Sequence, residues 1–330
     1  MIPAGALAAL VAALVPLAAG APAPQTSCTV SDRRLAELSG LAVDADGIWA
    51  VADSGRRTDV HRLDPRTCAI VESRSAPIDP RDAEDLTVGP DGALWVADTG
   101  DNRRQRDTVA VIVLPPVGEP RLHRLTYPDG PHDAEALLVD GDGVPVILTK
   151  EAGRSAGIYR TAAPPAGEGP TPLVKAGEYR LPVSDTAGGP LGGLGSRLVT
   201  GAASNADRSV VAVRSYTDAW LHAVPDGDLV AALLRPPAAR VPLAGEPQGE
   251  AIAFLPDGTL LSGSERRDGV AGELRAVPGA AALVEGGAAG AVGTPATAGG
   301  PPGWLPATLG AAAVAGLLAL VTAGLARRRR

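Results

Sequence analysis

A two-strand pattern recurs five times along the chain and constrains the fold more than any other feature of the sequence. Each copy is a short run of mostly small or apolar residues that ends in an Asp-Gly-type turn and is followed by a second apolar run. Asp-Gly favours a tight hairpin because the backbone must enter positive φ at the turn. Arg208 replaces the turn glycine once. The turn aspartates are Asp46, Asp91, Asp142, Asp207 and Asp257.

The spacing of the copies indicates what each one belongs to. Successive copies begin 45, 51, 65 and 50 residues apart, at Leu38, Ala83, Ala134, Val199 and Gly249. A four-stranded propeller blade takes ~40–50 residues. The last copy lacks a fourth strand, which residues 28–31 can supply by closing the ring. The sequence therefore predicts an all-β, five-bladed β-propeller. The Gly-rich stretch 187–195 leaves a degenerate sixth blade as the alternative.

The N-terminus has the character of an export signal. Residues 2–23 are almost wholly small and apolar, and Ala21-Pro22-Ala23 fits a signal peptidase site. No Lys or Arg precedes Arg33, so the usual positive n-region is missing. We expect a signal peptide over residues 1–23, with an uncleaved N-terminal anchor as the alternative.

The C-terminus has the character of a membrane anchor. Residues 305–326 carry no charge and, as a helix, would span roughly 33 Å. Four arginines follow at 327–330, which the positive-inside rule places in the cytoplasm. We expect a transmembrane helix at 304–326, an Ala/Gly/Pro-rich stalk at 278–303 and an extracytoplasmic propeller at 28–277.

A cell-wall sorting signal is the alternative reading of this tail. Leu305-Pro306-Ala307-Thr308 resembles the start of a sortase signal, although Leu309 stands where such a signal has glycine. Sortase cleaves after the threonine, so on this alternative the mature protein would be attached to the wall.

Charge and cysteine content narrow the class of protein further. The chain of 330 residues has a net charge of −7, and its mature part shows no clustered Lys and Arg of the kind that binds nucleic acid. Its two cysteines, Cys28 and Cys68, both lie in the part expected to be exported, where disulfides persist. We predict a Cys28–Cys68 disulfide between the closing strand and the outer strand of the first blade.

Ring symmetry brings equivalent residues together at the central channel. The residue seven positions before each turn aspartate begins an innermost strand, and in a propeller these positions share one height and radius. Oxygen-only clusters suit Ca²⁺ or Mg²⁺, and crowded carboxylates also suit acid–base chemistry. The candidate ligand-binding residues are Ser39, Glu84, Glu135, Thr200 and Glu250.

Two aspartates at the ends of second strands, Asp53 and Asp98, extend this set. We expect a metal site formed by Glu84, Glu135, Glu250, Asp98 and Asp53, with calcium as the candidate cation. The competing interpretation is structural. Glutamates at strand starts can cap backbone amides, and residues 98–103 (Asp-Thr-Gly-Asp-Asn-Arg) suit an Asx-type turn.

Several segments resemble the secreted bacterial β-propellers grouped as phytase-like or esterase-like. The resemblance covers nearly all of residues 28–277 and rests on residues 38–41, 83–86, 96–103, 134–137 and 248–252. It implies a propeller fold and hydrolysis of phosphate or carboxylic esters. No Gly-x-Ser-x-Gly nucleophile motif occurs. Two functions therefore stay open: a membrane-tethered ligand- or cation-binding hydrolase, and a non-catalytic scaffold for an unidentified small molecule or envelope component.

Overall fold

The computed structural model describes residues 21–152, 155–167 and 169–284, all within one compact unit. Strands dominate these residues. The helical elements among them are η1 (Arg33–Leu35), η2 (Gly192–Arg197) and α1 (Leu229–Leu233). The predicted all-β class is therefore confirmed.

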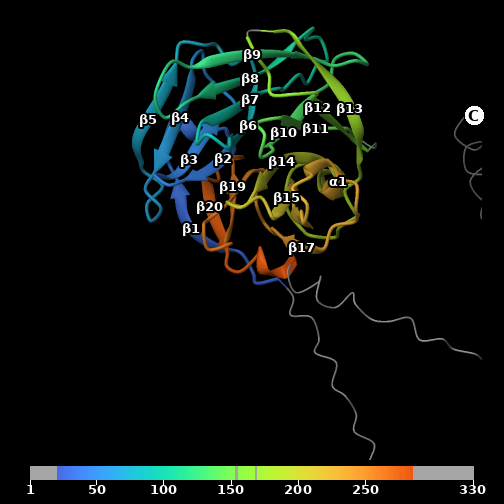
Figure 1. Cartoon of the computed structure of the whole chain (residues 1–330). Helices are drawn as coiled ribbons and strands as arrows, with labels where there is room; N and C mark the ends of the chain where they lie inside the picture. Colours follow the sequence, from blue (N-terminus) through green and yellow to red (C-terminus); the bar gives the residue numbers. More distant parts are fainter. Residues whose placement is uncertain (1–20, 153–154, 168, 285–330) are drawn as a thin grey trace, which may run out of the picture. The chain divides into compact units, whose positions relative to one another are not determined.

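The strands form four-stranded antiparallel blades around a common centre, so this part of the chain is a β-propeller (Figure 1). Blade 1 contains β2 (Leu38–Asp44), β3 (Gly47–Ala52), β4 (Thr58–Leu63) and β5 (Ile70–Ala76). Blade 2 contains β6 (Ala83–Val88), β7 (Leu94–Asp98), β8 (Val109–Leu114) and β9 (Arg121–Thr126). Blade 3 contains β10 (Ala134–Val139), β11 (Pro145–Thr149), β12 (Ala156–Thr161) and β13 (Thr171–Tyr179).

Two further blades complete the ring. Blade 4 contains β14 (Val199–Ser204), β15 (Val210–Ser215), β16 (Asp218–Ala223) and β17 (Ala239–Pro242). Blade 5 contains β18 (Gly249–Phe254), β19 (Leu260–Ser264), β20 (Gly272–Val277) and β1 (Gln25–Val30). Blades 2 and 3 are joined at their outer edges by a short parallel pairing of β9 with β13. Residues 180–198, between β13 and β14, contain η2 and no described strand, so the alternative sixth blade is not found there.

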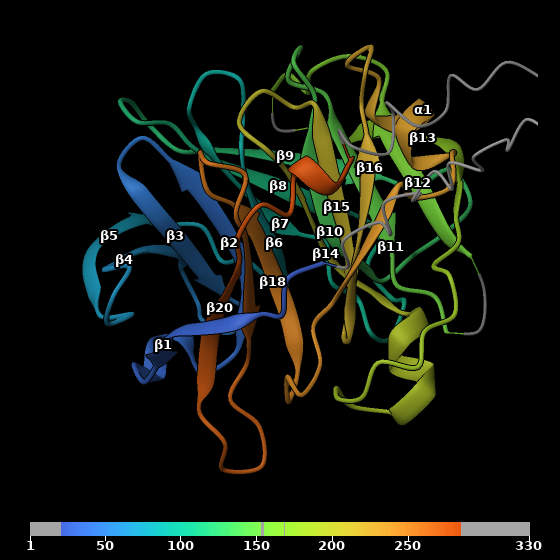
Figure 2. The same cartoon turned by 90° about the horizontal axis from the view of Figure 1, so that it is seen from below.

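The ring closes as the sequence predicts. β1 pairs antiparallel with β20, from Gln25–Ala276 to Val30–Gly272 (Figure 2). The N-terminal strand thereby covers the sheet edge that the last blade would otherwise expose. The predicted disulfide joins Cys28 on β1 to Cys68. Cys68 lies in the turn that precedes β5 rather than in the strand itself, at a positive φ of 57°.

Apolar faces of neighbouring blades pack against each other. Between blades 1 and 2, for example, Trp49 and Val60 pack in one buried cluster with Leu94 and Ile112. Burying each such side chain contributes about 1.5–3 kcal/mol. The packed region extends past the predicted boundary at residue 277, because Ala280, Ala281 and Val284 lie in the same buried cluster as Phe254.

The predicted signal peptide, stalk and membrane segments lie mostly or wholly outside the residues that the structure describes. The helix at 304–326 and the arginine tail 327–330 lie outside them, as do most of the signal peptide and most of the stalk. Among the described residues, no helix is long and apolar enough to cross a membrane.

Candidate metal centre

The five equivalent positions predicted from the repeat share one local feature, a β-bulge. In each inner strand the pairing with the second strand skips one residue, for example between Leu38 and Gly40 in β2. A bulge leaves one residue unpaired and turns its side chain out of the regular alternation, often beside a functional site. The skipped residues are Ser39, Glu84, Glu135, Thr200 and Glu250.

Glu84 lies at the centre of two overlapping carboxylate groups. Carboxylate oxygens of Glu84, Asp133 and Glu135 lie within 4.8 Å of one another, and so do those of Glu84, Asp82 and Asp53. Asp82 and Asp133 immediately precede β6 and β10, whereas Asp53 follows β3. Hard cations such as Ca²⁺ take oxygen ligands in this kind of arrangement. The two groups therefore form one candidate cation site at the start of the inner strands.

The backbone leaves room for these carboxylates at Gly100. A β-carbon on Gly100 would overlap Glu84 Oε1 and the carboxyl group of Asp82. The Gly100 amide donates to the Asp82 carbonyl at 3.2 Å, which holds the loop after β7 against the site. A glycine is thus required for the backbone to approach the carboxyl groups this closely.

Electrostatics at the site favour a bound proton or cation. Burial, followed by repulsion from Glu135 and Asp53, raises the pKa of Glu84 well above its usual range. Burial also raises the pKa of Glu135 to about 8, against the attraction of Lys150. Burial and a hydrogen bond with Asp82 raise the pKa of Asp53 to about 7. Each carboxyl group therefore binds a proton more tightly than a solvent-exposed one, because the concentrated negative charge is unfavourable.

Lys150 neutralises part of this charge. It follows β11, and its Nζ lies 2.6 Å from Glu135 Oε1 and 5.3 Å from the centre of the Tyr216 ring. Burial lowers the pKa of Lys150, but the nearby Glu135 carboxylate outweighs this and raises it overall. The ammonium group therefore stays charged and fixes the orientation of Glu135.

The end of the central channel at which the inner strands begin is called the carboxylate mouth, and Glu250 occupies a different part of it from Glu84. Its Oε1 accepts a hydrogen bond from Gln248 Nε2 at 3.1 Å. Burial and a hydrogen bond with Glu265 raise its pKa well above the usual range. Burial likewise raises the pKa of Glu265, so both glutamates bind a proton more tightly than exposed ones do. Glu250 also repels Glu84 and Glu135 electrostatically, although it does not belong to either close carboxylate group.

The remaining predicted residues have other partners. Ser39 donates its hydroxyl proton to the Ala83 carbonyl at 2.9 Å, and Thr200 donates to the Gly249 carbonyl at 3.2 Å. Each therefore ties its inner strand to the inner strand of a neighbouring blade. Asp98 is paired with Arg106 at 2.9 Å and accepts the Asp82 amide at 3.1 Å, so its carboxylate holds the loop after β7.

The sequence contained a signal for Asp82 and Asp133. The tripeptide Asp-Ala-Glu occurs at residues 82–84 and again at 133–135. With the bulge at each glutamate, the structure brings the two carboxylates of each tripeptide together. The two copies, at the starts of adjacent inner strands, therefore supply four of the carboxylates in the two overlapping groups around Glu84.

Comparison with known proteins gives only distant likenesses. No known protein family matches the sequence, and no curated protein matches it. Among solved structures, streptogramin B lyase has a TM-score of 0.36 at 14% identity over 72% of this chain. This chain covers 64%, less than two thirds, of that lyase.

The match to two other solved structures covers a larger share of those proteins. A gluconolactonase from Xanthomonas campestris has a TM-score of 0.41 at 16% identity, over 80% of this chain and 89% of that one. The PQQ-bound aldose sugar dehydrogenase from Streptomyces coelicolor has a TM-score of 0.41 at 12% identity, over 80% and 99%. The assignment of the site rests on this chain's own residues.

Proposed function

We propose that this propeller binds a divalent cation, with calcium as the candidate, and hydrolyses phosphate or carboxylic esters at the carboxylate mouth. The observation behind this proposal is that carboxylate oxygens of Glu84, Asp133 and Glu135 lie within 4.8 Å of one another, at the starts of two adjacent inner strands. Asp53 and Asp82 complete an all-oxygen set that suits a hard cation. The resemblance to phytase-like and esterase-like propellers supports the same reaction class.

Different residues around the site would hold the cation, orient its ligands and donate a proton. A divalent cation, when bound, would supply Lewis acidity toward an ester oxygen. Glu84, Asp133 and Glu135 would hold it, and Lys150 would keep Glu135 oriented through their 2.6 Å contact. Glu250, whose pKa is raised by burial and by the neighbouring Glu265, would donate the proton that the leaving group needs.

We further propose that the protein is exported and anchored to the membrane by residues 304–326, with the propeller outside. The Cys28–Cys68 disulfide supports export because such bonds persist in oxidising compartments. Protease shaving of intact cells tests this proposal. Release of the propeller supports it, complete protection opposes it, and covalent wall attachment after Thr308 would favour the sortase alternative.

A non-catalytic envelope scaffold is the second candidate function. The segment between β13 and β14 carries exposed apolar side chains, with Val183 70%, Leu191 64% and Leu194 41% exposed. This segment packs on Tyr216, which neighbours Lys150. Exposed apolar residues beside a binding mouth suit contact with another protein.

Cation binding is the first test. Calorimetric titration of the purified, chelator-treated protein with Ca²⁺ should show saturable binding. Glu84→Gln should weaken the affinity at least about tenfold, because it removes one charged ligand shared by both groups. Gly100→Ala should also weaken it by displacing Glu84 and Asp82, although it removes no ligand. Glu119→Gln, in an exposed turn, is the matched control and should bind normally.

Hydrolysis is the second test. With Ca²⁺ present, we expect turnover of p-nitrophenyl phosphate or p-nitrophenyl butyrate that chelation abolishes and Glu84→Gln reduces. Cation binding without turnover of either ester class would favour the scaffold. Absence of cation binding in the wild-type protein would overturn the metal site itself.

A further inference from the structure

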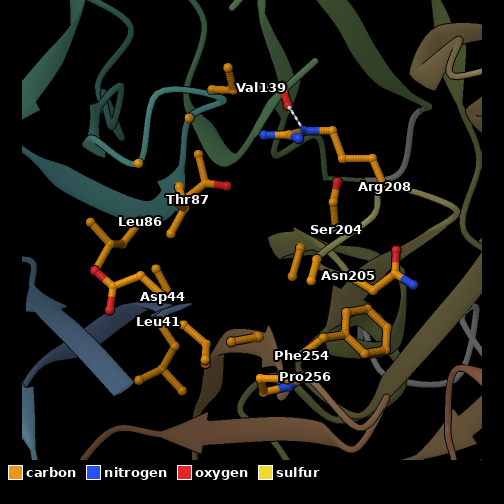
Figure 3. A pocket seen from close by; sticks show the side chains of 18 of the residues that line it. Leu41, Asp44, Leu86, Thr87, Val139, Ser204, Asn205, Arg208, Phe254 and Pro256 are labelled. Atoms are coloured by element: carbon orange, nitrogen blue, oxygen red, sulfur yellow. Dashed lines mark hydrogen bonds between the residues drawn. The ribbon is translucent and has the colours of Figure 1, made fainter. Parts of the chain in front are cut away.

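A cavity lies at the opposite end of the inner strands from the carboxylates. Its volume is about 390 Å³, within the range of ~300–1,000 Å³ that small-molecule sites span. It is formed by the last residues of inner strands and by their hairpin turns (Figure 3). Leu41, Leu86 and Phe254 give it an apolar wall, and each of these side chains is buried from bulk solvent.

The centre of the propeller separates this cavity from the carboxylate mouth. Asp85 is fully buried there and binds backbone amides of β6, β10 and β14. The inner strands also approach closely beside it. A β-carbon on Gly40 would meet Asp85 backbone atoms at 2.7 Å, and one on Gly201 would meet the Glu250 carbonyl oxygen at 2.5 Å. The cavity is therefore a site of its own and not an extension of the candidate metal centre.

One hairpin that borders the cavity has a different residue at the last turn position from the equivalent hairpins of the other four blades. At the last position of the turn, four blades have glycine with positive φ, at Gly47, Gly92, Gly143 and Gly258. Blade 4 has Arg208 there, at φ 58°. A left-handed conformation is unfavourable for a residue with a β-carbon, and such strain often accompanies a binding role.

Arg208 and Ser204 bring polar groups with unused hydrogen-bonding capacity to this wall. Arg208 Nε donates to the Val139 carbonyl at 3.3 Å (Figure 3). Among the residues that the structure describes, no carboxylate forms an ion pair with its guanidinium. Ser204 Oγ is buried and has no hydrogen-bond partner among the described residues. Buried polar groups are almost always hydrogen-bonded, so an unpaired hydroxyl beside a guanidinium that has no carboxylate partner indicates a missing acceptor.

The opposite rim limits the charge of that acceptor. Asp44 lines the cavity, and its Oδ1 accepts the amides of Asp46 and Gly47 at 2.8 and 3.1 Å. Its negative charge would repel a second anionic group. A ligand with one carboxylate at Arg208 and an uncharged apolar body against Leu41 and Leu86 would pair with the guanidinium and avoid repulsion by Asp44.

We propose that this cavity binds a small monocarboxylate with an apolar body, through Arg208 and Ser204. The carboxylate receives the guanidinium N–H groups and the Ser204 hydroxyl, and the apolar body replaces water against the leucine wall. Charge-assisted hydrogen bonds from a guanidinium to a carboxylate are strong and directional.

Octanoate is the probe for this site. The full chain in lipid nanodiscs is titrated with octanoate by calorimetry, with empty nanodiscs subtracted, and carboxyl-¹³C octanoate reports the head group by NMR. We expect saturable one-to-one binding and a shifted carboxyl resonance. Arg208→Gly should weaken binding at least about tenfold and abolish the shift, whereas Ser204→Ala should weaken it a few-fold. Gly is the residue that four other hairpins carry, so the Arg208→Gly variant should fold.

Matched controls separate the carboxylate contact from partition into lipid. Arg235→Gln, at an exposed arginine, should bind octanoate like the wild type. Octanamide should bind the wild type and Arg208→Gly equally, since it lacks the charge. Addition of chelator should change nothing, which separates this site from the metal centre. Absence of saturable octanoate binding at millimolar concentration, or equal binding by Arg208→Gly, would overturn the proposal.

Discussion

Asp85 accepts the backbone N–H of Ala202 at 3.2 Å, joining inner strands of two blades across 117 residues of sequence. The same Oδ2 accepts the Leu137 amide at 2.8 Å, and Oδ1 accepts the Leu86 amide at 2.8 Å. One carboxyl group therefore links three inner strands at the centre of the propeller. Burial raises the pKa of Asp85 well above its usual range, although the three N–H donors oppose the rise.

Asp85→Ala should destabilise the protein strongly. It leaves three buried amides without acceptors, and each unsatisfied group costs about 1–3 kcal/mol. We expect a loss of roughly 3 kcal/mol or more in the free energy of unfolding, measured by urea titration. Asp85→Asn keeps one acceptor oxygen and should cost less. Asp142→Ala, in an exposed turn, should have little effect. A loss below about 1 kcal/mol for Asp85→Ala would contradict the role in joining the strands.

The fold was predictable because each copy of the hairpin repeat has its turn aspartate at the same distance from the start of the inner strand, which aligns the strands of all five copies. Asp46 and its four equivalents set the turns, the spacing set the blades, and the missing fourth strand indicated that residues near Cys28 close the ring. The site was predictable only in part. The repeat identified Glu84 and Glu135, but the partners of Lys150 and Asp98 depend on where loop residues fold back, which the local pattern does not encode.

Ser39 and Thr200 illustrate a different limit of sequence reasoning. Both occupy the bulged position of the glutamates, as predicted. Short hydroxyl side chains nevertheless reach a neighbouring strand carbonyl before they reach the channel. Equivalence of backbone position therefore did not determine where the side-chain oxygen binds.

Stability without metal should fall as pH rises from about 5 to 8. The folded-state pKa values of Asp53 and Glu135 rise to about 7 and about 8, above the values near 4 of an unfolded chain. The folded protein then binds more protons than the unfolded one, so each group lowers stability by up to about 1.4 kcal/mol per pH unit between its two pKa values.

Urea titrations in chelator at several pH values measure this dependence. Saturating Ca²⁺ should reverse the trend, because the cation replaces the protons and binds more tightly as pH rises. Glu84→Gln should make the chelated protein less sensitive to pH by removing one of the repelling groups. Stability that rises from pH 5 to 8 in chelator would contradict the clustering of these carboxyl groups.

Loss of the disulfide should loosen the ring closure. Cys28 and Cys68 are 40 residues apart in sequence, and on the chain-entropy account closing such a loop stabilises the folded state by roughly 4 kcal/mol. We expect Cys28→Ser/Cys68→Ser to lose a comparable free energy of unfolding in urea. In the double variant, hydrogen exchange should show β1 opening before β18 and β19, because β1 pairs with β20 alone. In the wild type the disulfide should keep β1 protected. Equal protection of β1 in both proteins would contradict this account.

Arg208→Gly should stabilise the protein even though it removes a side chain and a hydrogen bond. The φ of 58° is unfavourable for arginine and natural for glycine. The bond that is lost, from Nε to the Val139 carbonyl at 3.3 Å, is long and half-exposed, so it is worth little. We expect a gain of about 1 kcal/mol in the free energy of unfolding, measured by urea titration without added carboxylate.

Ala206→Gly, two residues earlier in the same turn, is the matched control. Ala206 is not among the residues with positive φ, so glycine there adds freedom to the unfolded chain and should destabilise by about 0.5–1 kcal/mol. Opposite signs for the two substitutions would show that the strain resides at Arg208. The same comparison in octanoate should reduce the advantage of Arg208→Gly, since ligand binding stabilises only the protein that retains the guanidinium. Destabilisation by Arg208→Gly without ligand would mean that the arginine is kept for the turn itself.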